Sequence, residues 1–506
     1  MIRGLAHRDA TLWSRDAGVR RDIENRLGWL DAPAFMDHHA ARIAGFAERV
    51  RADGYGQAVL LGMGGSSLAP EVFAAILGGG PASLALTVLD STSPQQVQHV
   101  TRLCERGSTL FIVSSKSGTT AETGALEAYF FEWARQRFDR PGEHFVAITD
   151  PGSPLEALAR RREYREIFLN PADIGGRFSA LSFFGLVPAA LAGVDLAALR
   201  SHLPVLDAAP ALVTDACRLG RTLGSLARAG RNKLTLHLSP GLTPAAAWIE
   251  QLIDESTGKD GTGIVVVAGE ARLAPDRYGP DRVFVVVDPA GEPAEDDWIE
   301  ALAGLRHPVA RWRIDSPYHL GAELYRWEIA TALAGRELGV NPFDEPDVND
   351  SKAMTRTLLE RGEGAARRLP ETTDDMDRLL AEARAGDYVA ILAYLAPSPA
   401  NRRRLADWAA GLGRRTGLPC CVGFGPRYLH SSGQLHKGGP NQGLFIVLTL
   451  DSDFDLPVPG SAYGFKSLIE AQANGDLRVL EERGRRVVHL SVRDESALAE
   501  LIDATI

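Results

Sequence analysis

Short apolar runs alternate with segments of helical periodicity along most of this chain. The first ~50 residues carry apolar side chains at spacings near 3.6, which predicts helix. A later helix opens at Ser93-Pro94, a serine cap followed by a proline. Strands that alternate with helices are typical of a parallel, doubly wound sheet. The first strands are predicted at 57–63, 86–89, 110–113 and 145–148.

The same alternation of predicted strands and helices occurs twice more further along the chain. A second set of strands is predicted at 234–238, 264–267, 283–287 and 309–314, with helices at 243–257 and 321–338. A third set is predicted at 387–395, 420–423 and 444–450, with helices at 401–412 and 466–483. We therefore expect an α/β fold with two doubly wound parallel-sheet domains, a helical N-terminal segment and an additional α/β C-terminal region. The predicted limits are 1–50 for the helical segment, 51–224 and 225–365 for the two domains, and 366–506 for the C-terminal region.

Composition narrows the class of protein. The 506 residues carry a formal net charge of −10, which argues against a nucleic-acid surface built on clustered Lys and Arg. Four cysteines without CxxC spacing suit a reduced compartment, and no signal-peptide pattern or metal-ligand spacing such as HExxH occurs. The longest apolar stretch, 183–194, is too short to span a bilayer. We expect a cytoplasmic protein that binds neither nucleic acid nor membrane.

A hydroxyl-rich turn follows the predicted strand at 110–113 and ends where a helix begins. Its side chains include those of Ser115, Lys116, Ser117 and Thr120. Hydroxyl donors, an ammonium group and the positive end of a helix dipole together favour an anion, and a phosphate held without a metal is the ligand they suggest. The alternative interpretation is a capping box formed by Thr119 and Glu122, and the two can coexist.

A second candidate for anion binding is a glycine-rich turn between a strand and a helix. The turn reads Leu61-Gly62-Met63-Gly64-Gly65-Ser66-Ser67. Two of its glycines fit a dinucleotide fingerprint, but Ser67 occupies the third glycine position. Asp90 could supply the acidic residue that such a site needs at the end of the next strand. The alternative is that Gly65 lets the backbone approach a sugar phosphate while Ser66 donates a hydrogen bond.

Two further segments hold groups suited to charge stabilisation and proton transfer. Gly176 allows the chain to approach a ligand just before Arg177, whose guanidinium can stabilise negative charge on a reacting oxygen. Glu255 lies in the last turn of the helix predicted at 243–257, which Thr243 can cap. The negative end of the helix dipole raises the pKa of a carboxylate there, as a general base requires. The alternative is a surface arginine and a solvated acid.

The second half of the chain adds a lysine and two histidines. Lys352 follows a proline-rich turn and lies on a predicted helix. His430 and His436 lie in a glycine-rich loop, and histidine exchanges protons near neutral pH. The alternative is that His436 and the neighbouring Lys437 are loop residues that face solvent.

Five of these segments occur in the order found in the phosphoglucose isomerase family, which the chain resembles over roughly residues 55 to 355. The resemblance implies two sugar isomerase (SIS) domains and the interconversion of D-glucose 6-phosphate and D-fructose 6-phosphate through an enediolate, with no cofactor. Family members are commonly dimers, so a homodimer is expected. The tail resembles the isomerase half of bifunctional transaldolase/phosphoglucose isomerases, which implies a functional link to a transaldolase. The five segments are Gly64-Gly65-Ser66, Ser115–Thr120 with Glu122, Gly175-Gly176-Arg177, Glu255–Lys259 and Asn341–Asp344.

The resemblance also implies roles for individual residues. Glu255 would be the base that moves a proton between C2 and C1, and Arg177 would stabilise the enediolate oxygen. Lys352 would assist at the ring oxygen or the phosphate, and Lys116 would add backbone or charge to the phosphate site. The phosphate would be held by Ser66, Ser115, Ser117 and Thr120, with Gly65 and Gly176 beside the substrate.

Two positions depart from the family pattern. Glu345 stands where the family usually has glutamine, and the negative charge of a carboxylate there would be unfavourable beside a phosphate. The family's ring-opening histidine lies between the base and the lysine, and no matching segment stands there in this chain. We therefore expect His430 to open the ring, with His436 as the second candidate and Glu122 as the partner of the histidine.

Three other functions compete with this one. The first is an isomerase of broader specificity that also accepts mannose 6-phosphate, because the same base can serve both epimers. The second is a non-catalytic SIS protein that binds sugar phosphates, which would not need Glu255, Arg177 and Lys352 together. The third is a nicotinamide-dependent oxidoreductase that uses the glycine-rich turn.

Overall fold

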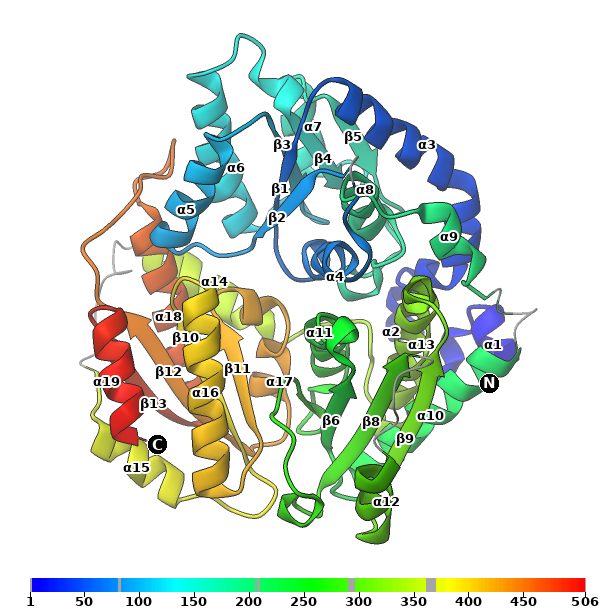
Figure 1. Cartoon of the computed structure of the whole chain (residues 1–506), viewed down its shortest axis with the longest axis vertical. Helices are drawn as coiled ribbons and strands as arrows, with labels where there is room; N and C mark the ends of the chain where they lie inside the picture. Colours follow the sequence, from blue (N-terminus) through cyan, green and yellow to red (C-terminus); the bar gives the residue numbers. More distant parts are fainter. Residues whose placement is uncertain are drawn as a thin grey trace.

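Three parallel β-sheets form the framework of the protein and follow one another along the chain (Figure 1). The computed structural model describes residues 2–80, 83–204, 206, 210–289, 296–360 and 370–505. In Figure 1 the first sheet lies at the top, and the second and third lie side by side beneath it. The site described below lies where the three meet.

The first sheet has the strand order β2-β1-β3-β4-β5. All six residues of β3 are buried, because helices cover both faces of a doubly wound sheet. Its strands are β1 (Gln57–Gly62), β2 (Ala85–Leu89), β3 (Thr109–Ser114), β4 (Phe145–Thr149) and β5 (Glu166–Leu169). The helices around it are α3 (Ala32–Ala52), η3 (Gly64–Ser66), α4 (Leu68–Leu77), α5 (Pro94–Cys104), α6 (Ala121–Arg135), η4 (Pro141–His144), α7 (Pro154–Arg161), η5 (Gly176–Phe178), α8 (Phe183–Leu191) and α9 (Leu196–Ser201).

The second sheet contains β6 (Lys233–Leu238), β7 (Val265–Val267), β8 (Arg282–Pro289) and β9 (Val309–Ile314) in the order β7-β6-β8-β9. Gly220 lets one of its helices, α10, pack closely against another, α13, because a Cβ there would lie 2.1 Å from the carbonyl oxygen of Ala330. The helices of this unit are α10 (Pro210–Arg228), η6 (Pro240–Leu242), α11 (Ala245–Thr257), η7 (Pro275–Arg277), α12 (Asp296–Gly304), η8 (Pro317–His319) and α13 (Leu320–Leu338).

The predicted cap of α11 is wrong. The N-cap of α11 is Pro244, without a side-chain capping bond, and the Thr243 hydroxyl donates to the carbonyl oxygen of Pro240 at 3.0 Å. The reason is that the chain forms the 3₁₀ turn η6 immediately before α11, and the carbonyl groups of that turn accept the hydroxyl proton.

The third sheet has the order β11-β10-β12-β13. Its last strand and the final helix were not predicted, because arginine and histidine side chains interrupt the apolar pattern of β13. The strands are β10 (Tyr388–Tyr394), β11 (Cys420–Phe424), β12 (Gly443–Leu450) and β13 (Arg486–Val492). The helices are α14 (Val348–Glu360), α15 (Thr373–Ala381), α16 (Pro399–Thr416), η9 (Arg427–His430), α17 (Gly433–Gly438), α18 (Phe465–Glu482) and α19 (Glu495–Thr505).

All three sheets place their first strand between their second and third strands. The chain therefore adds the second strand on one side of the first strand and then crosses back to add the third on the other side, which makes each sheet doubly wound and confirms the predicted fold class. The limits predicted for the domains stay predictions, and the one between 365 and 366 lies outside the described residues.

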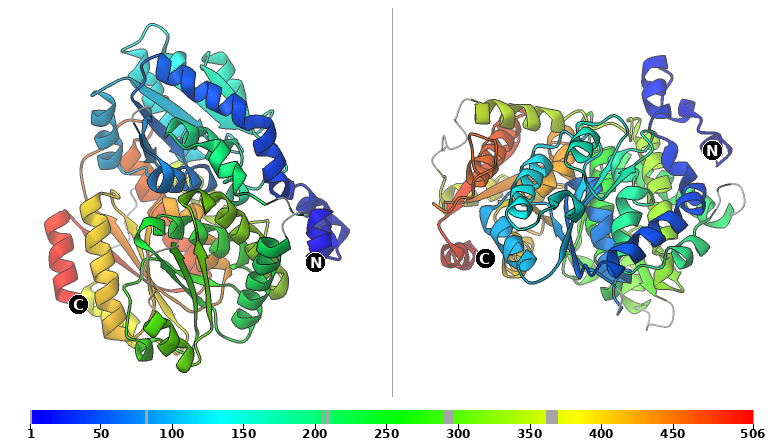
Figure 2. Two further views of the ribbon diagram at one scale, coloured as in Figure 1. Left: turned by 45° about the vertical axis from the view of Figure 1, so that its right-hand side comes forward. Right: turned by 90° about the horizontal axis from the view of Figure 1, so that it is seen from above.

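The N-terminal segment is helical, as predicted, and lies at the edge of the molecule. Figure 2 shows its first helices on the side opposite the C-terminus. Its elements before α3 are α1 (Ile2–Ala6), η1 (Ala10–Leu12), α2 (Ala17–Glu24) and η2 (Gly28–Asp31). Among the helices of the described residues, none has the length and apolarity needed to cross a membrane.

A mostly buried arginine, with 13% of its side chain exposed, joins the third unit to the first. Arg427, at the start of η9, donates through Nη1 to Asp90 Oδ2 at 2.9 Å, and its Nη2 pairs with Glu71 of α4. Burial raises the pKa of Asp90, although the Arg427 charge opposes that rise. Because η9 ends at His430, these ion pairs fix the segment that carries the histidine against the first sheet.

We expect Arg427→Met to lower the free energy of unfolding by about 3 kcal/mol, because Asp90 would keep a buried charge without its cation. Urea unfolding followed by circular dichroism would measure the loss. The control is Arg404→Met, which removes a more exposed ion pair with Glu495 and should cost less than about 1 kcal/mol. Equal losses in the two variants would contradict the assigned role of Arg427.

Candidate active site

A cavity of about 1280 Å³ lies between the three units. Each unit contributes polar side chains to its wall, and the space is large enough for a sugar phosphate. The wall includes Ser66, Thr120, Arg177, Glu255, Lys352 and His430. Residues separated by more than 300 positions in sequence therefore face one space.

Two glycine turns contact one another on one wall of the cavity. A Cβ at Gly65 would lie 2.0 Å from the carbonyl oxygen of Gly176, so only glycine allows η3 and η5 to approach this closely. Gly65, Ser66 and Gly176 all line the cavity, and their predicted role beside a substrate stays a prediction. This contact places Arg177, the residue after Gly176, beside the glycine-rich turn.

The groups that a dinucleotide site would need are engaged elsewhere. Ser67 donates its hydroxyl proton to the carbonyl oxygen of Gly64 at 3.1 Å and contacts Asp90 at 3.3 Å. Asp90 is buried and paired with Arg427, so it cannot accept hydrogen bonds from a ribose. The structure therefore disfavours the interpretation of the glycine-rich turn as a dinucleotide fingerprint.

The hydroxyl-rich turn before α6 borders the cavity with only part of its side chains. Lys116, Ser117 and Thr120 line the cavity, whereas Ser115 is buried and is not part of the cavity wall among the described residues. The Ser115 hydroxyl contacts Thr120 Oγ1 at 3.0 Å and accepts the N–H of Gly118 at 3.2 Å. Ser115 therefore holds the shape of the turn from inside.

Lys116 does not present a free ammonium group to the cavity. Its Nζ pairs with the Asp150 carboxylate and donates to the carbonyl oxygen of Ala172 at 3.0 Å. Burial raises the pKa of Asp150, and the hydrogen bond and charge of Lys116 oppose that rise. The positive charge of Lys116 is thus partly balanced before any anion binds.

Glu122 contacts the histidine predicted to be its partner. Its Oε1 lies 3.0 Å from Nε2 of His430 and accepts a hydrogen bond from Gln472 at 2.7 Å. Burial alone would raise the pKa of Glu122, but the charge and hydrogen bond of His430 lower it below its usual value. The capping-box alternative is wrong, because Thr120 is the N-cap residue of α6 and no side-chain capping bond forms there.

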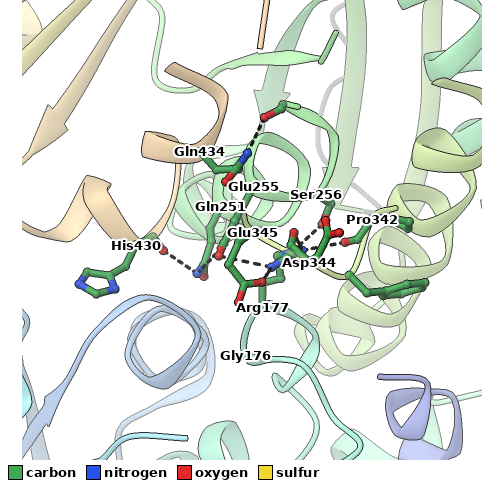
Figure 3. A network of polar contacts seen from close by, with 12 residues as sticks. Gly176, Arg177, Gln251, Glu255, Ser256, Pro342, Asp344, Glu345, His430 and Gln434 are labelled. Atoms are coloured by element: carbon green, nitrogen blue, oxygen red, sulfur yellow. Dashed lines mark hydrogen bonds and ion pairs between the residues drawn. The ribbon is translucent and has the colours of Figure 1, made fainter. Parts of the chain in front are cut away.

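Arg177 is the most highly connected side chain at the cavity (Figure 3). Its Nε donates to the hydroxyl of Ser256 at 2.8 Å, and its Nη2 donates to the carbonyl oxygens of Pro342 and Asp344, both at 2.8 Å. Its Nη1 donates to Oε2 of Glu345 at 2.9 Å and lies 3.3 Å from Oε1 of Glu255. The Arg177 side chain is 4% exposed, so these partners replace water almost completely.

Glu255 lies in the last turn of α11, as predicted, and is buried. Its pKa is raised, as the sequence suggests, but burial is the largest cause and the nearby Arg177 charge opposes it. Oε2 of Glu255 accepts a hydrogen bond from Gln251 at 3.1 Å. A buried carboxylate with a raised pKa and a cation beside it can act as a general base near neutral pH.

Gln251 is the site residue that sequence reasoning missed. Its Nε2 donates both to Glu255 and to the backbone carbonyl of His430, the latter at 2.8 Å. In Figure 3 this carbonyl faces Gln251, while the imidazole of His430 extends the other way. The available signal was its position four residues before Glu255, which places both side chains on one face of α11.

The two candidate histidines differ sharply in environment. His430 lines the cavity, whereas His436 is buried and contacts the hydroxyl of Tyr388 at 3.0 Å. Burial lowers the pKa of His436 to about 3, so its imidazole is neutral at physiological pH. Of the two, only His430 is placed to meet a ligand in the cavity.

The turn that carries Glu345 is anchored by a buried lysine. Lys259 donates through Nζ to the carbonyl oxygen of Asn341 and to Oδ1 of Asp344, both at 2.7 Å. Burial lowers the pKa of Lys259 to about 8.

Among the residues the structure describes, no three His, Cys, Asp or Glu side chains are grouped to hold a metal ion.

Comparison with known proteins places the chain among sugar-phosphate isomerases. The model of the family "Phosphoglucose isomerase" matches residues 32–198. A glucose-6-phosphate isomerase of Heliobacterium modesticaldum is 30% identical over 391 residues, which cover 66% of this chain and 87% of that relative. A solved structure of a hypothetical protein from Thermus thermophilus has a TM-score of 0.58 at 27% identity, and covers 71% of this chain and 94% of its own. A glucose-6-phosphate isomerase structure from Chlamydia trachomatis shares the fold, with a TM-score of 0.52 at 22% identity over 74% of this chain and 81% of its own.

We expect Gly65→Ala to lower kcat/KM about 100-fold, because the new Cβ would push η3 away from Gly176 and displace Arg177. Steady-state kinetics with the substrate proposed below would measure the loss. The matched control is Gly175→Ala, whose Cβ would meet its nearest neighbour, a Phe178 ring atom, at 3.8 Å. A Gly65→Ala variant as active as the Gly175→Ala variant would contradict the assigned packing role.

Proposed function

This chain belongs to the phosphoglucose isomerase family, and we propose that its cavity is where D-glucose 6-phosphate and D-fructose 6-phosphate are interconverted. The observation that carries this proposal is the arrangement around Arg177. A buried base, Glu255, lies 3.3 Å from a buried guanidinium, and both line one cavity. Base and cation side by side suit a reaction that removes a proton from carbon and leaves negative charge on the adjacent oxygen.

The phosphate end of the substrate is assigned to the hydroxyl-rich turn. Ser117 and Thr120 line the cavity together with Ser66, so hydroxyl groups from two turns face the same space. The N-terminus of α6 begins directly after Thr120 and adds the positive end of its dipole. Ser115 supports this site by shaping the turn, and Lys116 contributes a charge already shared with Asp150.

His430 is the proposed ring-opening group. It lines the cavity and contacts the buried carboxylate of Glu122. The pKa of Glu122 is lowered by its contact with His430, despite its burial, so Glu122 is an ionised carboxylate that can accept a hydrogen bond from the imidazole. The imidazole can then donate a proton to the ring oxygen as the ring opens and recover one from the C1 hydroxyl. Lys352, on the cavity wall, is assigned to assist at the ring oxygen or the phosphate.

The isomerisation step then uses Glu255. In the open-chain aldose it removes the proton from C2, and the electron pair of that C–H bond forms the C1–C2 double bond of the enediolate. Arg177 stabilises the negative charge on oxygen. Glu255 returns the proton to C1, and a hydroxyl proton passes from O2 to O1, which gives the ketose. No atom is gained or lost, so the step needs no further reactant.

The other functions have less support. A non-catalytic sugar-phosphate sensor would not need a buried base beside Arg177. A dinucleotide site would need the carboxylate of Asp90 for the ribose, but that carboxylate is paired with Arg427. Broader specificity that includes mannose 6-phosphate stays open, because Glu255 could serve both epimers. We also propose a cytoplasmic location, a homodimer and a functional link to a transaldolase. The first is supported by four cysteines that are all free thiols in the structure, and the other two by family resemblance.

Glu255→Gln should lower kcat about 10²–10⁴-fold with little change in KM, because it removes the base and keeps the shape of the side chain. The assay supplies fructose 6-phosphate and couples the product to glucose-6-phosphate dehydrogenase, with NADPH followed by absorbance. Glu132→Gln, on the exposed face of α6, is the control and should match the wild type. Absence of NADPH formation with wild-type protein at high concentration would refute the proposed function.

His430→Ala should slow the exchange of substrate anomers, which requires ring opening, more than it slows proton transfer between C1 and C2. Magnetisation-transfer NMR measures the first rate, and loss of label from substrate deuterated at C2 measures the second. His436→Ala removes a buried imidazole that does not line the cavity and should lower thermal stability while anomer exchange continues. Equal anomer-exchange rates in wild type and His430→Ala would exclude His430 as the ring-opening group.

A further inference from the structure

Arg177 has fewer free donors than its proposed role demands. A guanidinium has five N–H groups, of which Nε carries one and each terminal nitrogen carries two. Ser256 takes the Nε donor, and two backbone carbonyls take both donors of Nη2. The two donors of Nη1 face Glu345 at 2.9 Å and Glu255 at 3.3 Å. A substrate oxygen can therefore gain an Arg177 N–H only if one carboxylate gives up its place.

The two carboxylates differ in how firmly they are held. The Glu255 side chain is 11% exposed, and its second oxygen accepts a hydrogen bond from Gln251. The Glu345 side chain is 36% exposed, and within the described part of the chain Arg177 is its one hydrogen-bond partner. Glu345 lies on a turn rather than in a helix, although Lys259 anchors the backbone of that turn. Glu345 is therefore the carboxylate that can leave Nη1 for solvent.

Glu345 also acts on the charge of the base. Burial raises the pKa of Glu255, Arg177 lowers it, and the nearby Glu345 charge raises it again. Burial alone would raise the pKa of Glu345, but Arg177 lowers it, so Glu345 carries its negative charge at neutral pH. Lys352 of α14 is the second cation that acts on Glu255.

The other charged groups around α11 are engaged elsewhere. On α11 itself, Glu250 contacts Ser432, and Asp254 accepts the N–H of Val266. On the elements packed against α11, the ion pairs are Glu71 of α4 with Arg427, Lys437 of α17 with Asp476, and Glu323 of α13 with Arg326. Besides burial and the hydrogen bond from Gln251, the charges that act on the pKa of Glu255 are therefore those of Arg177, Glu345 and Lys352.

We propose that Glu345 is a positioning residue of this isomerase: it occupies Nη1 of Arg177, as a second carboxylate beside Glu255, until a substrate oxygen displaces it. This inference rests on the proposed function. Substrate binding then replaces one oxygen acceptor of Arg177 by another while Glu255 stays beside the guanidinium, so the buried cation keeps an anionic partner. A glutamine at position 345 would hold the same N–H by a weaker hydrogen bond to an uncharged oxygen, which a ligand oxygen displaces more easily, and it would make Glu255 less basic.

The test compares Glu345→Gln with the wild type by pH profile. The acidic limb of kcat/KM reports ionisation of the base in the free enzyme. Removal of the Glu345 charge lowers the pKa of Glu255, so the limb should move to lower pH by about one unit. Glu345→Asp keeps the charge and should return the limb toward its wild-type position. A purely structural role would change rates without moving the limb.

A second measurement follows ligand binding without turnover. The probe is a five-carbon aldonate with a terminal phosphate, whose carboxylate mimics the enediolate oxygens. Glu345→Gln should bind it about tenfold more tightly than the wild type by calorimetry, because the hydrogen bond that must be broken first is weaker. The matched control is Glu360→Gln, which removes an exposed carboxylate from the wall of the same cavity. It should leave both the affinity and the acidic limb unchanged.

The outcomes of these experiments distinguish a failure of this inference from a failure of the proposed isomerase function. An active wild type whose acidic limb and probe affinity are unchanged in Glu345→Gln would overturn the role of Glu345 and leave the isomerase assignment standing. Equal shifts in Glu345→Gln and Glu360→Gln would also overturn it, because a general charge effect would then suffice. A wild type without isomerase activity would overturn the proposed function and this inference together.

Discussion

The buried guanidinium of Arg177 is the constraint on which the site depends. A charge removed from water costs several kcal/mol unless partners replace the solvent, so each donor of Arg177 must find an acceptor. Those acceptors come from the end of α11, from the turn before α14 and from the base itself. One cation thereby fixes the relative positions of segments that are far apart in sequence. Glu255 is in place because it is one of the groups that satisfies this cation.

The packing of the first two units supports that constraint. A single hydrophobic core runs from the helices of the first sheet to those of the second and includes Phe178, Trp248 and Tyr325. Phe178 follows Arg177 directly, and Trp248 lies on the helix that ends beside Glu255. Both site segments are therefore anchored in one apolar interior, which keeps the distance between base and guanidinium short.

Much of the fold could be predicted from the sequence because buried parallel strands read as plain apolar runs. β1 and β3 are such runs, and the glycine after α11 marks the turn in which Glu255 lies. The hydrogen bond from Gln251 to the His430 carbonyl and the ion pairs of Arg427 could not be predicted, since they depend on how the third unit docks on the first two. The inward direction of the Ser115 side chain and the capping of α11 could also not be predicted from the sequence. Both depend on backbone geometry within a single turn.

The third unit brings His430 to the cavity, the second unit brings Glu255, and the first brings the hydroxyl-rich turn with Ser117 and Thr120. All of these groups belong to one polypeptide, so their meeting is an intramolecular event. The fold sets the effective concentration of these groups relative to one another, and dilution of the protein does not change that effective concentration. The meeting of these three groups therefore does not require the association of two chains.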